Sequence, residues 1–555
     1  MKEKNRLEEA LSTGFRLLER KTEHFGHAHE SVAHTLNETG LIYMAMGEYE
    51  KAESFFTDAL QILENCFGDA HPDVAAVLNN LAYFHDKVGN YAEAESFYKK
   101  SLKIEEKTFG SDHPALSDCL NNLGNLYHTV GNYTEAESLL KKALKIRKKA
   151  FGLQHPDVAV SLNSLAYLYH TLGNYAEAEP LYKKSLKIRK KIFGLEHPDV
   201  ATGLHNLAAF YESTGNYAEA ESLYKRSLKI RKKIFGTEHP DVAKCLNDLA
   251  LLYNTAENYE KAETLFKKTL EIKEKIFGTE HKDVSQCLNN LASLYDTIGN
   301  YEKAEVHYKR ALEILEKTSG QEYPDVATVL SNIASLYDTI GNYEKAEIHY
   351  KRALEILEKT NGPEHPDVAT VLSNLAFIYN NSGDYEKSEH FYKRALEISE
   401  IIFGAEHPDV AQCLNNLASH YNNVSNYRKA EIHYQRALEI LEKTNGPEHP
   451  DVATVLSNLA FLYKKSGNYK KAEPLFNREL KIREKIFGAE HPDTFRCLNN
   501  LINTYNTVGD YKKYKSLYKK ALRIWEKVSA SNYSDGAIIL RGCLNNRLIN
   551  FFKAA

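Results

Sequence analysis

The sequence lacks a long apolar run and a net charge of either sign. No apolar segment approaches the ~18 residues that a membrane helix needs, and the charged N-terminus, MKEKNRLEEALSTGFRLLER, has no apolar centre of a signal peptide. The 71 basic and 75 acidic residues leave a formal charge of −4, which predicts neither a nucleic-acid binder nor an acidic tail. These absences predict a cytoplasmic protein with no membrane partner.

Cysteine is scarce, with seven residues in 555. A cysteine that recurs at one position of a repeat is typical of a buried small apolar side chain, whereas disulfide frameworks are typical of short secreted chains. We therefore predict reduced core thiols and no redox role. Five cysteines share one repeat position: Cys119, Cys245, Cys287, Cys413 and Cys497.

The motifs of several enzyme classes are also missing. The sequence contains no GxxxxGK[ST], no HExxH and no GxSxG. Residues 352–377 and 436–461 are the same string, RALEILEKTNGPEHPDVATVLSNLAF. Near-identical units argue against one catalytic pocket, which needs unlike residues converging on a point. We therefore predict a protein that is not an enzyme and holds no cofactor and no metal.

A period of 42 residues organises the chain. The register extends back to His29 and forward to Tyr533, which makes twelve units. HPDV or a variant of it marks each unit and starts at His71, His113, His155, His197, His239, His281, Tyr323, His365, His407, His449 and His491.

Each unit predicts a pair of helices. Pro156 suits the first turn of a helix, because the N–H that it lacks has no partner there. Gly173 ends this helix, and a second one runs from Tyr175 until Gly194. Spacings of three and four predict two buried faces. Their residues are Val158, Leu162, Leu165, Ala166 and Tyr169 in the first helix, and Ala178, Leu181, Tyr182, Leu186 and Ile188 in the second.

The histidines that open the units suit a helix start better than a metal site. Consecutive ones lie a whole repeat apart, and zinc needs nitrogen ligands within about 2.1 Å. No segment alternates with period two, so we predict no sheet.

Stacking of the pairs predicts an all-α, right-handed superhelical solenoid whose ends need capping. We expect a capping helix in residues 1–28, twelve repeats in 29–532 and a closing helix in 533–555. In that last segment CLNN recurs at Cys543–Asn546, four residues late against the period.

The pattern LNNLAxLYxxxGNYxxAExxYxxAL resembles the tetratricopeptide signature. In one unit its residues are Leu165, Ala166, Tyr169, Ala178 and Tyr182, with Ser185 in place of the last alanine. The longer unit, with GxEHPDVA and KRALEIxEK, resembles the repeat of kinesin light chains and their prokaryotic relatives. The chain has no heptad segment to join a motor, so we expect a motor-free relative that binds proteins.

An asparagine series on the first helices is the main candidate site. The resemblance implies that this position, and those four, seven and eight residues further on, line a concave groove. An amide both donates to and accepts from a peptide backbone, so these rows suit an extended peptide. The alternative is a structural role, which we expect for neighbouring asparagines such as Asn290. The predicted groove residues are Asn79, Asn121, Asn125, Asn163, Asn247, Asn254, Asn289, Asp296, Asn380, Asn415, Asn422, Asn499, Tyr83, Tyr167, Phe377 and Phe461.

Lysines on early second helices form a second candidate, here called the basic ridge. It suits an acidic partner or nucleic acid, but no aromatic stacking motif accompanies it, which favours a solvated face over nucleic acid. The basic ridge comprises Lys183, Lys187, Lys190, Lys191, Lys229 and Lys232.

The sequence therefore predicts a scaffold that binds one or more proteins or peptides. Three alternatives stay open. The protein is a peptide-sensing regulator that changes curvature, an assembly module that packs on itself, or the sensor subunit of a separately encoded enzyme.

Overall fold

The computed structural model describes residues 2–46, 49–489 and 492–530, and these residues form helices and short turns with no strand among them. A leading helix, α1 (Lys2–Phe25), precedes the helix pairs. The first helices of the pairs are α2 (Glu30–Met46), α4 (Pro72–Lys87), α6 (Leu116–Thr129), α8 (Pro156–Thr171), α10 (Pro198–Ser213), α12 (Pro240–Thr255), α14 (Lys282–Thr297), α16 (Pro324–Thr339), α18 (Pro366–Ser382), α20 (Pro408–Asn423), α22 (Pro450–Lys465) and α24 (Pro492–Val508). The second helices are α3 (Tyr49–Phe67), α5 (Tyr91–Phe109), α7 (Tyr133–Phe151), α9 (Tyr175–Phe193), α11 (Tyr217–Phe235), α13 (Tyr259–Phe277), α15 (Tyr301–Ser319), α17 (Tyr343–Thr360), α19 (Tyr385–Phe403), α21 (Tyr427–Thr444), α23 (Tyr469–Phe487) and α25 (Tyr511–Ala530).

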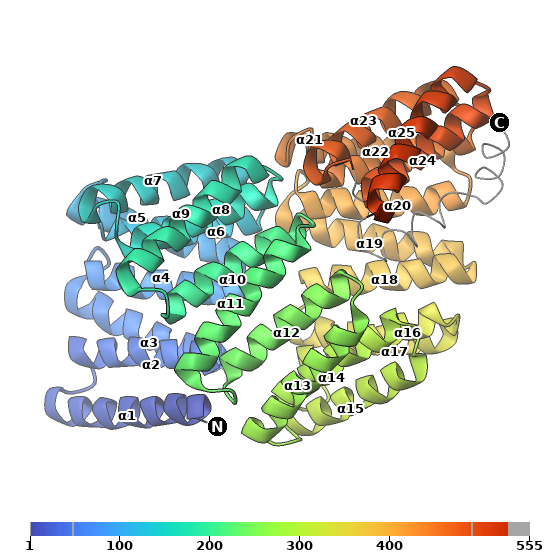
Figure 1. Cartoon of the computed structure of the whole chain (residues 1–555). Coiled ribbons are helices and arrows are strands. Elements are labelled where there is room, and N and C mark those ends of the chain that lie inside the picture. The colour runs from blue at the N-terminus through green and yellow to red at the C-terminus, as the bar shows by residue number, and fades with distance from the viewer. Residues whose placement is uncertain (1, 47–48, 490–491, 531–555) are drawn as a thin grey trace. The chain divides into compact units, whose positions relative to one another are not determined.

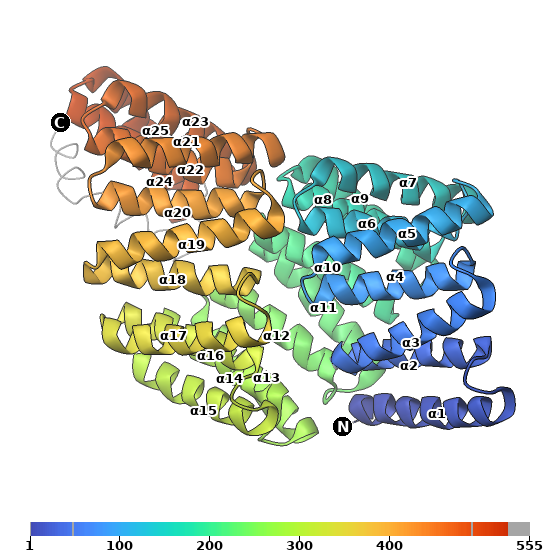
Figure 2. The same cartoon turned by 180° about the vertical axis from the view of Figure 1, so that it is seen from behind.

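The contacts divide the chain into two compact units. The first comprises the chain up to Tyr169 together with Ala176–Gly203, and the second comprises His170–Tyr175 together with the described chain from Leu204 on. Within the second unit, the helices from α13 to α25 stack in chain order, as Figures 1 and 2 show from opposite sides. The all-α solenoid of paired helices predicted from the period is confirmed. Among the described helices, none is long and apolar enough to cross a membrane.

Most opening histidines start the first helices as predicted, whereas α6 begins at Leu116, three residues after His113. The Nδ1 atom of His239 accepts the backbone N–H of Asp241 at 3.2 Å, and Phe235, at the end of the preceding helix, stacks on the His239 ring at 4.4 Å between centroids. His71 and His281 cap α4 and α14 in the same way. Within the described residues, no group of His, Cys, Asp and Glu could hold a metal ion.

The predicted core positions are buried with two exceptions. Val158, Leu162, Leu165 and Ala166 lie in the interior, whereas Tyr169 and Leu181 are only half-buried. Tyr169 reaches the surface because its hydroxyl donates to Glu137 of the preceding second helix at 2.5 Å. The five cysteines at the shared position are buried and unpaired, and burial raises the pKa of the Cys119 thiol to about 12 and that of Cys287 to about 11.

The Tyr169–Glu137 contact is one case of a bond that joins successive pairs. Tyr295 donates to Glu263 at 2.7 Å, and Lys267 lies 2.7 Å from the same carboxylate. Hydrogen bonds from Lys267 and Tyr295 lower the pKa of Glu263. The equivalent tyrosine bonds recur from Tyr127 to Tyr505. Each of these bonds links a second helix to the next first helix and helps to fix the register of the stack.

At one position of the second helix, α5 carries a glutamate where α7, α9, α11 and α23 carry an arginine. Arg147 of α7 bonds Asp118 and the carbonyl of Asp157, but Glu105 stands at its register position in α5. Burial, and then the charge of Asp118, raises the pKa of Glu105 to about 7, and one of its oxygens is buried without a hydrogen-bond partner in the described chain.

We expect Glu105→Gln to stabilise the protein above neutral pH. The folded state raises this pKa from 4.5 to about 7, so the wild type loses stability as pH rises through that window. The gain at pH 8 should be about 1–2 kcal/mol, allowing for solvent screening of a half-exposed group, and should vanish near pH 4. Urea unfolding at both pH values measures it. The control is Glu106→Gln, which breaks the 2.7 Å bridge to Lys142 and should give no gain at pH 8.

Candidate functional site

The predicted asparagine series lies on one face of the first helices. Positions such as Asn247, Leu251 and Asn254 are spaced by four and three residues and therefore share a face of the helix. We call this surface, repeated on each first helix, the first-helix face.

The two neighbouring asparagine series bond to each other between repeats. The side-chain amide of Asn290 donates to Asn247 Oδ1 at 2.8 Å, and Asn332 donates to Asn289 Oδ1 at 2.8 Å. Equivalent bonds run from Asn80 to Asn37, from Asn122 to Asn79 and from Asn458 to Asn415. The neighbouring series therefore bridges helices, as predicted. The first series takes part in that bridge as the acceptor, through its side-chain oxygens.

Two members of the first series are less accessible than expected. Asn121 and Asn415 expose only 6% and 7% of their surface. Asn415 is held there by the bond from Asn458 at 2.8 Å. The expectation that the whole series is open is therefore wrong at these two repeats, whereas Asn79, Asn163, Asn247, Asn289 and Asn499 are half-buried.

Four residues after the position of the first asparagine series, several first helices expose a large apolar side chain. Tyr83, Tyr167, Phe377 and Phe461 are 40–53% exposed, and so are Leu41 and Leu251, which the prediction missed. Small or polar residues hold this position in other repeats: Asn125, Ala209, Ser293, Ser335, Ser419 and Asn503. Large side chains thus recur at every second repeat within 83–251 and again within 377–461, a pattern visible once the sequence is aligned on the 42-residue period.

The third row of the first-helix face carries oxygen atoms that the protein leaves unbonded. One side-chain oxygen each of Asn254, Asp296, Asp338 and Asn422 is buried without a hydrogen-bond partner in the described chain. Burial raises the pKa of Asp296 and of Asp338. Asn380 differs, since its oxygen contacts the ring of His420 at 3.2 Å. The sequence predicted this row, Asp338 included, but not which of its side chains lack internal partners.

The basic ridge is partly neutralised by its own helix. Lys183 lies 2.6 Å from Glu179, whereas Lys187, Lys191 and Lys229 are exposed and Lys190 and Lys232 are half-buried.

Like charges meet between neighbouring second helices near the basic ridge. The charge of Lys184, after burial, lowers the pKa of Lys148, and Lys268 does the same to Lys232. At the equivalent position other repeats pair a base with an acid: Lys142 with Glu106, Arg352 with Glu316 and Arg394 with Glu358. The Lys148–Lys184 pair lies in the first unit and the Lys232–Lys268 pair in the second.

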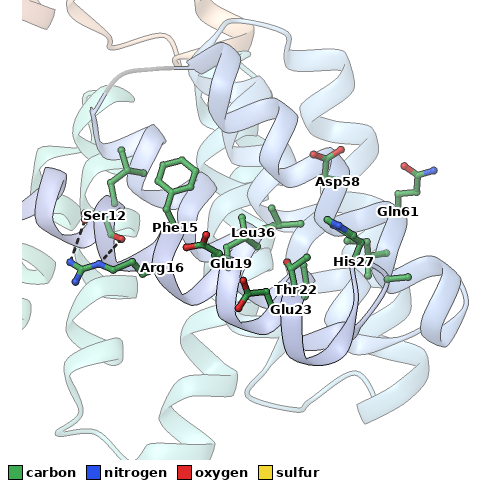
Figure 3. A pocket seen from close by; sticks show the side chains of 15 residues that line it. Ser12, Phe15, Arg16, Glu19, Thr22, Glu23, His27, Leu36, Asp58 and Gln61 are labelled. Carbon is green, nitrogen blue, oxygen red and sulfur yellow. Dashed lines mark hydrogen bonds between the residues drawn. The ribbon is translucent and has the colours of Figure 1, made fainter.

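A separate apolar pocket lies between α1, α2 and α3 (Figure 3). Its volume is about 1170 Å³, and its walls include Leu11, Phe15 and Leu36, rimmed by Glu19 and Asp58. At the register positions of Leu11 and Phe15, helix α5 carries Glu95 and Lys99. These two pair with each other, and Glu95 also accepts a hydrogen bond from Tyr127 of α6. Phe15 instead meets Tyr43 edge to face at 6.5 Å. Apolar packing thus replaces the polar inter-repeat contact at the leading helix.

The fold defines an all-α protein built of helix-pair repeats. The tetratricopeptide repeat model matches overlapping segments from residue 31 to residue 527: 31–106, 73–149, 121–191, 199–275, 253–317, 299–359, 325–401, 367–443, 414–485 and 451–527. The chain therefore belongs to the tetratricopeptide repeat family.

Similar solved structures include kinesin-light-chain-like proteins. BtubC (BKLC) from P. vanneervenii is 25% identical, with 42% of this chain and 92% of that chain covered and a TM-score of 0.35. A putative kinesin light chain of Podosopora anserina is 27% identical over 37% of this chain and 98% of its own, with a TM-score of 0.34. A Rap protein complexed with competence and sporulation factor is 16% identical, with 67% and 98% covered and a TM-score of 0.40. A comparison with curated proteins gave no match.

Proposed function

We propose that this chain is a non-enzymatic, cytoplasmic scaffold that binds extended segments of partner proteins along the first-helix face, as the concave side of the solenoid. The observation that carries this proposal is the row of half-buried polar side chains at Asn254, Asp296, Asp338 and Asn422 on the first-helix face. An amide side chain donates to and accepts from a peptide backbone, and a carboxylate accepts its N–H groups. An extended peptide presents both kinds of backbone group.

The exposed apolar side chains on the same face support a protein partner. Leu251, Phe377 and Phe461 offer contact area beside the polar rows, and aromatic side chains in a polar surround are typical of binding hot spots. Near-identical repeats present this combination several times, which suits a long, extended segment better than a single compact ligand.

The test is a paired measurement of binding and stability. A random peptide library selected on the full chain supplies ligands, whose Kd is then measured. Replacing both Asn254 and Asn422 with alanine should weaken binding roughly 5–150-fold, because two hydrogen bonds of about 0.5–1.5 kcal/mol each are removed. Tm should stay the same or rise, since neither oxygen has an internal partner and an unbonded buried acceptor is itself destabilising.

The matched control is Asn290→Ala, which removes the 2.8 Å bond to Asn247. It should lower the stability of the protein by about 0.5–1.5 kcal/mol and leave Kd unchanged. If Asn290→Ala loses binding while the double variant only melts early, the roles of the two rows are reversed. Selection of no peptide at all would argue against the proposal.

A second function, binding of an acidic partner, is favoured by the like-charged pairs near the basic ridge. Lys148–Lys184 and Lys232–Lys268 repel each other where other repeats gain an ion pair. An anionic group between the two ammonium groups of a pair would relieve this repulsion.

A further inference from the structure

The first-helix face changes its chemistry along α12, α14, α16 and α18. Leu251 of α12 and Phe377 of α18 are 40% and 49% exposed. Between them, α14 and α16 place Ser293 and Ser335 at the same position, and the acids Asp296 and Asp338 one turn further on. Two acidic repeats are therefore flanked by two apolar ones.

No base within the described chain neutralises these two acids. The only basic residue of α14 is Lys282, at the first position of the helix, and α16 has none. Neither carboxylate forms an ion pair with a described residue, and one oxygen of each is buried without a hydrogen-bond partner. Asp86 holds the same repeat position in the first unit but has Lys87 at 3.4 Å. The surface around Asp296 and Asp338 thus complements positive charge.

The spacing of the repeats limits which segments fit. Side-chain amides of Asn290 and Asn332 reach the preceding first helix at 2.8 Å, so α12, α14 and α16 are packed neighbours, and packed helices lie about 8–10 Å apart. A polyproline II chain repeats its side-chain direction every three residues, over about 9 Å. Every third residue of such a chain therefore meets the next repeat.

We propose that α12–α18 bind an extended, polyproline II-like segment of a partner protein that carries two basic residues three apart, with a large apolar residue three positions before and after them. The apolar ends contact Leu251 and Phe377, and the basic residues pair with Asp296 and Asp338. This inference rests on the proposed function and specifies the partner's chemistry.

The probe is the synthetic peptide LPSRPSRPSF, compared with LPSEPSEPSF and with LPSQPSQPSF. Charge-assisted hydrogen bonds are stronger than neutral ones, so the arginine peptide should bind the full chain roughly tenfold or more tighter than the glutamine peptide. The glutamate peptide should be weaker still, and rising salt should narrow the differences.

Isosteric variants assign the effect to the two acids. Asp296→Asn with Asp338→Asn should abolish the preference for arginine over glutamine, whereas Asp86→Asn should leave it unchanged. Phe377→Ser, which installs the residue of α14 and α16 at that position, should weaken all three peptides equally, by roughly tenfold.

Two outcomes separate this inference from the proposed function. Equal binding of the three peptides, or a preference for arginine that survives the double Asp→Asn change, overturns the inference. If the library ligands nevertheless depend on Asn254 and Asn422, the proposed function stands without it. If neither library nor designed peptides bind, both are wrong.

Discussion

Replacing Phe266 with alanine is expected to lower the free energy of unfolding by about 3–5 kcal/mol, which is the usual cost of removing a buried phenylalanine. Phe266 of α13 is 1% exposed and packs in the core of the second unit. It is one of the aromatic residues that fill the space between a second helix and its own first helix, so alanine leaves a cavity there.

The damage should remain local, because each helix pair packs mainly on its neighbours. Hydrogen exchange should show loss of protection centred on α12–α15, with the amides of α22 and α23 unchanged. The control is Phe377→Ala, which removes a ring that is 49% exposed and should change stability by no more than about 0.5 kcal/mol. Loss of protection along the whole second unit would contradict nearest-neighbour stability.

Changing Lys148 and Lys232 to glutamate is expected to abolish binding of an acidic ligand and to stabilise the protein at the same time. Each change converts a like-charged pair into the base–acid pair that Lys142 and Glu106 form at 2.7 Å. Two charge reversals should weaken a polyanion about a hundredfold at low salt, and Tm should rise slightly, since each exposed ion pair adds up to about 1 kcal/mol.

Polyglutamate and duplex DNA are the probes for this variant, with affinity measured against salt concentration. For DNA, the log–log slope should fall by about one for each phosphate that the variant no longer neutralises. Reversal of Lys187, Lys190 and Lys191 to glutamate should reduce binding as well if the basic ridge is the site. If wild-type binding does not depend on salt, or if both variants bind as tightly as the wild type, the basic ridge is a solvated face and not a binding site.

Most of the fold prediction followed from the 42-residue period. The HPDV starts are evenly spaced, and histidines such as His239 cap a helix through contacts with residues nearby in sequence, here Phe235 and Asp241. Interactions over four residues or fewer are readable from sequence because the helix itself fixes their geometry. The leading helix was recognised for the same reason. The predicted closing helix at 533–555 lies outside the described residues.

The sequence predicted which residues share this face, but not how buried or hydrogen-bonded each side chain is. The sequence placed Asn247 and Asn254 on one face, since a spacing of seven residues is helical, and the 42-residue period placed Asp296 at the position of Asn254 in the next repeat. It gave no sign that Asn247 accepts a bond from Asn290, 43 residues away, or that Asn121 is buried. Those outcomes depend on how closely the next first helix approaches, which is a property of packing between repeats.

The sequence by itself determined the helix pairs, their boundaries and the face that carries the polar rows. Local capping and apolar periodicity need no knowledge of distant residues. Only the tertiary structure decided which polar atoms are satisfied internally, as in the Tyr295–Glu263 bond, and which have no internal partner, as for one oxygen each of Asp296 and Asp338. It also decided that Lys148 meets Lys184 rather than an acid. Hydrogen bonds and ion pairs form only within a few ångströms, and across repeats that proximity is created by the stacking of helices.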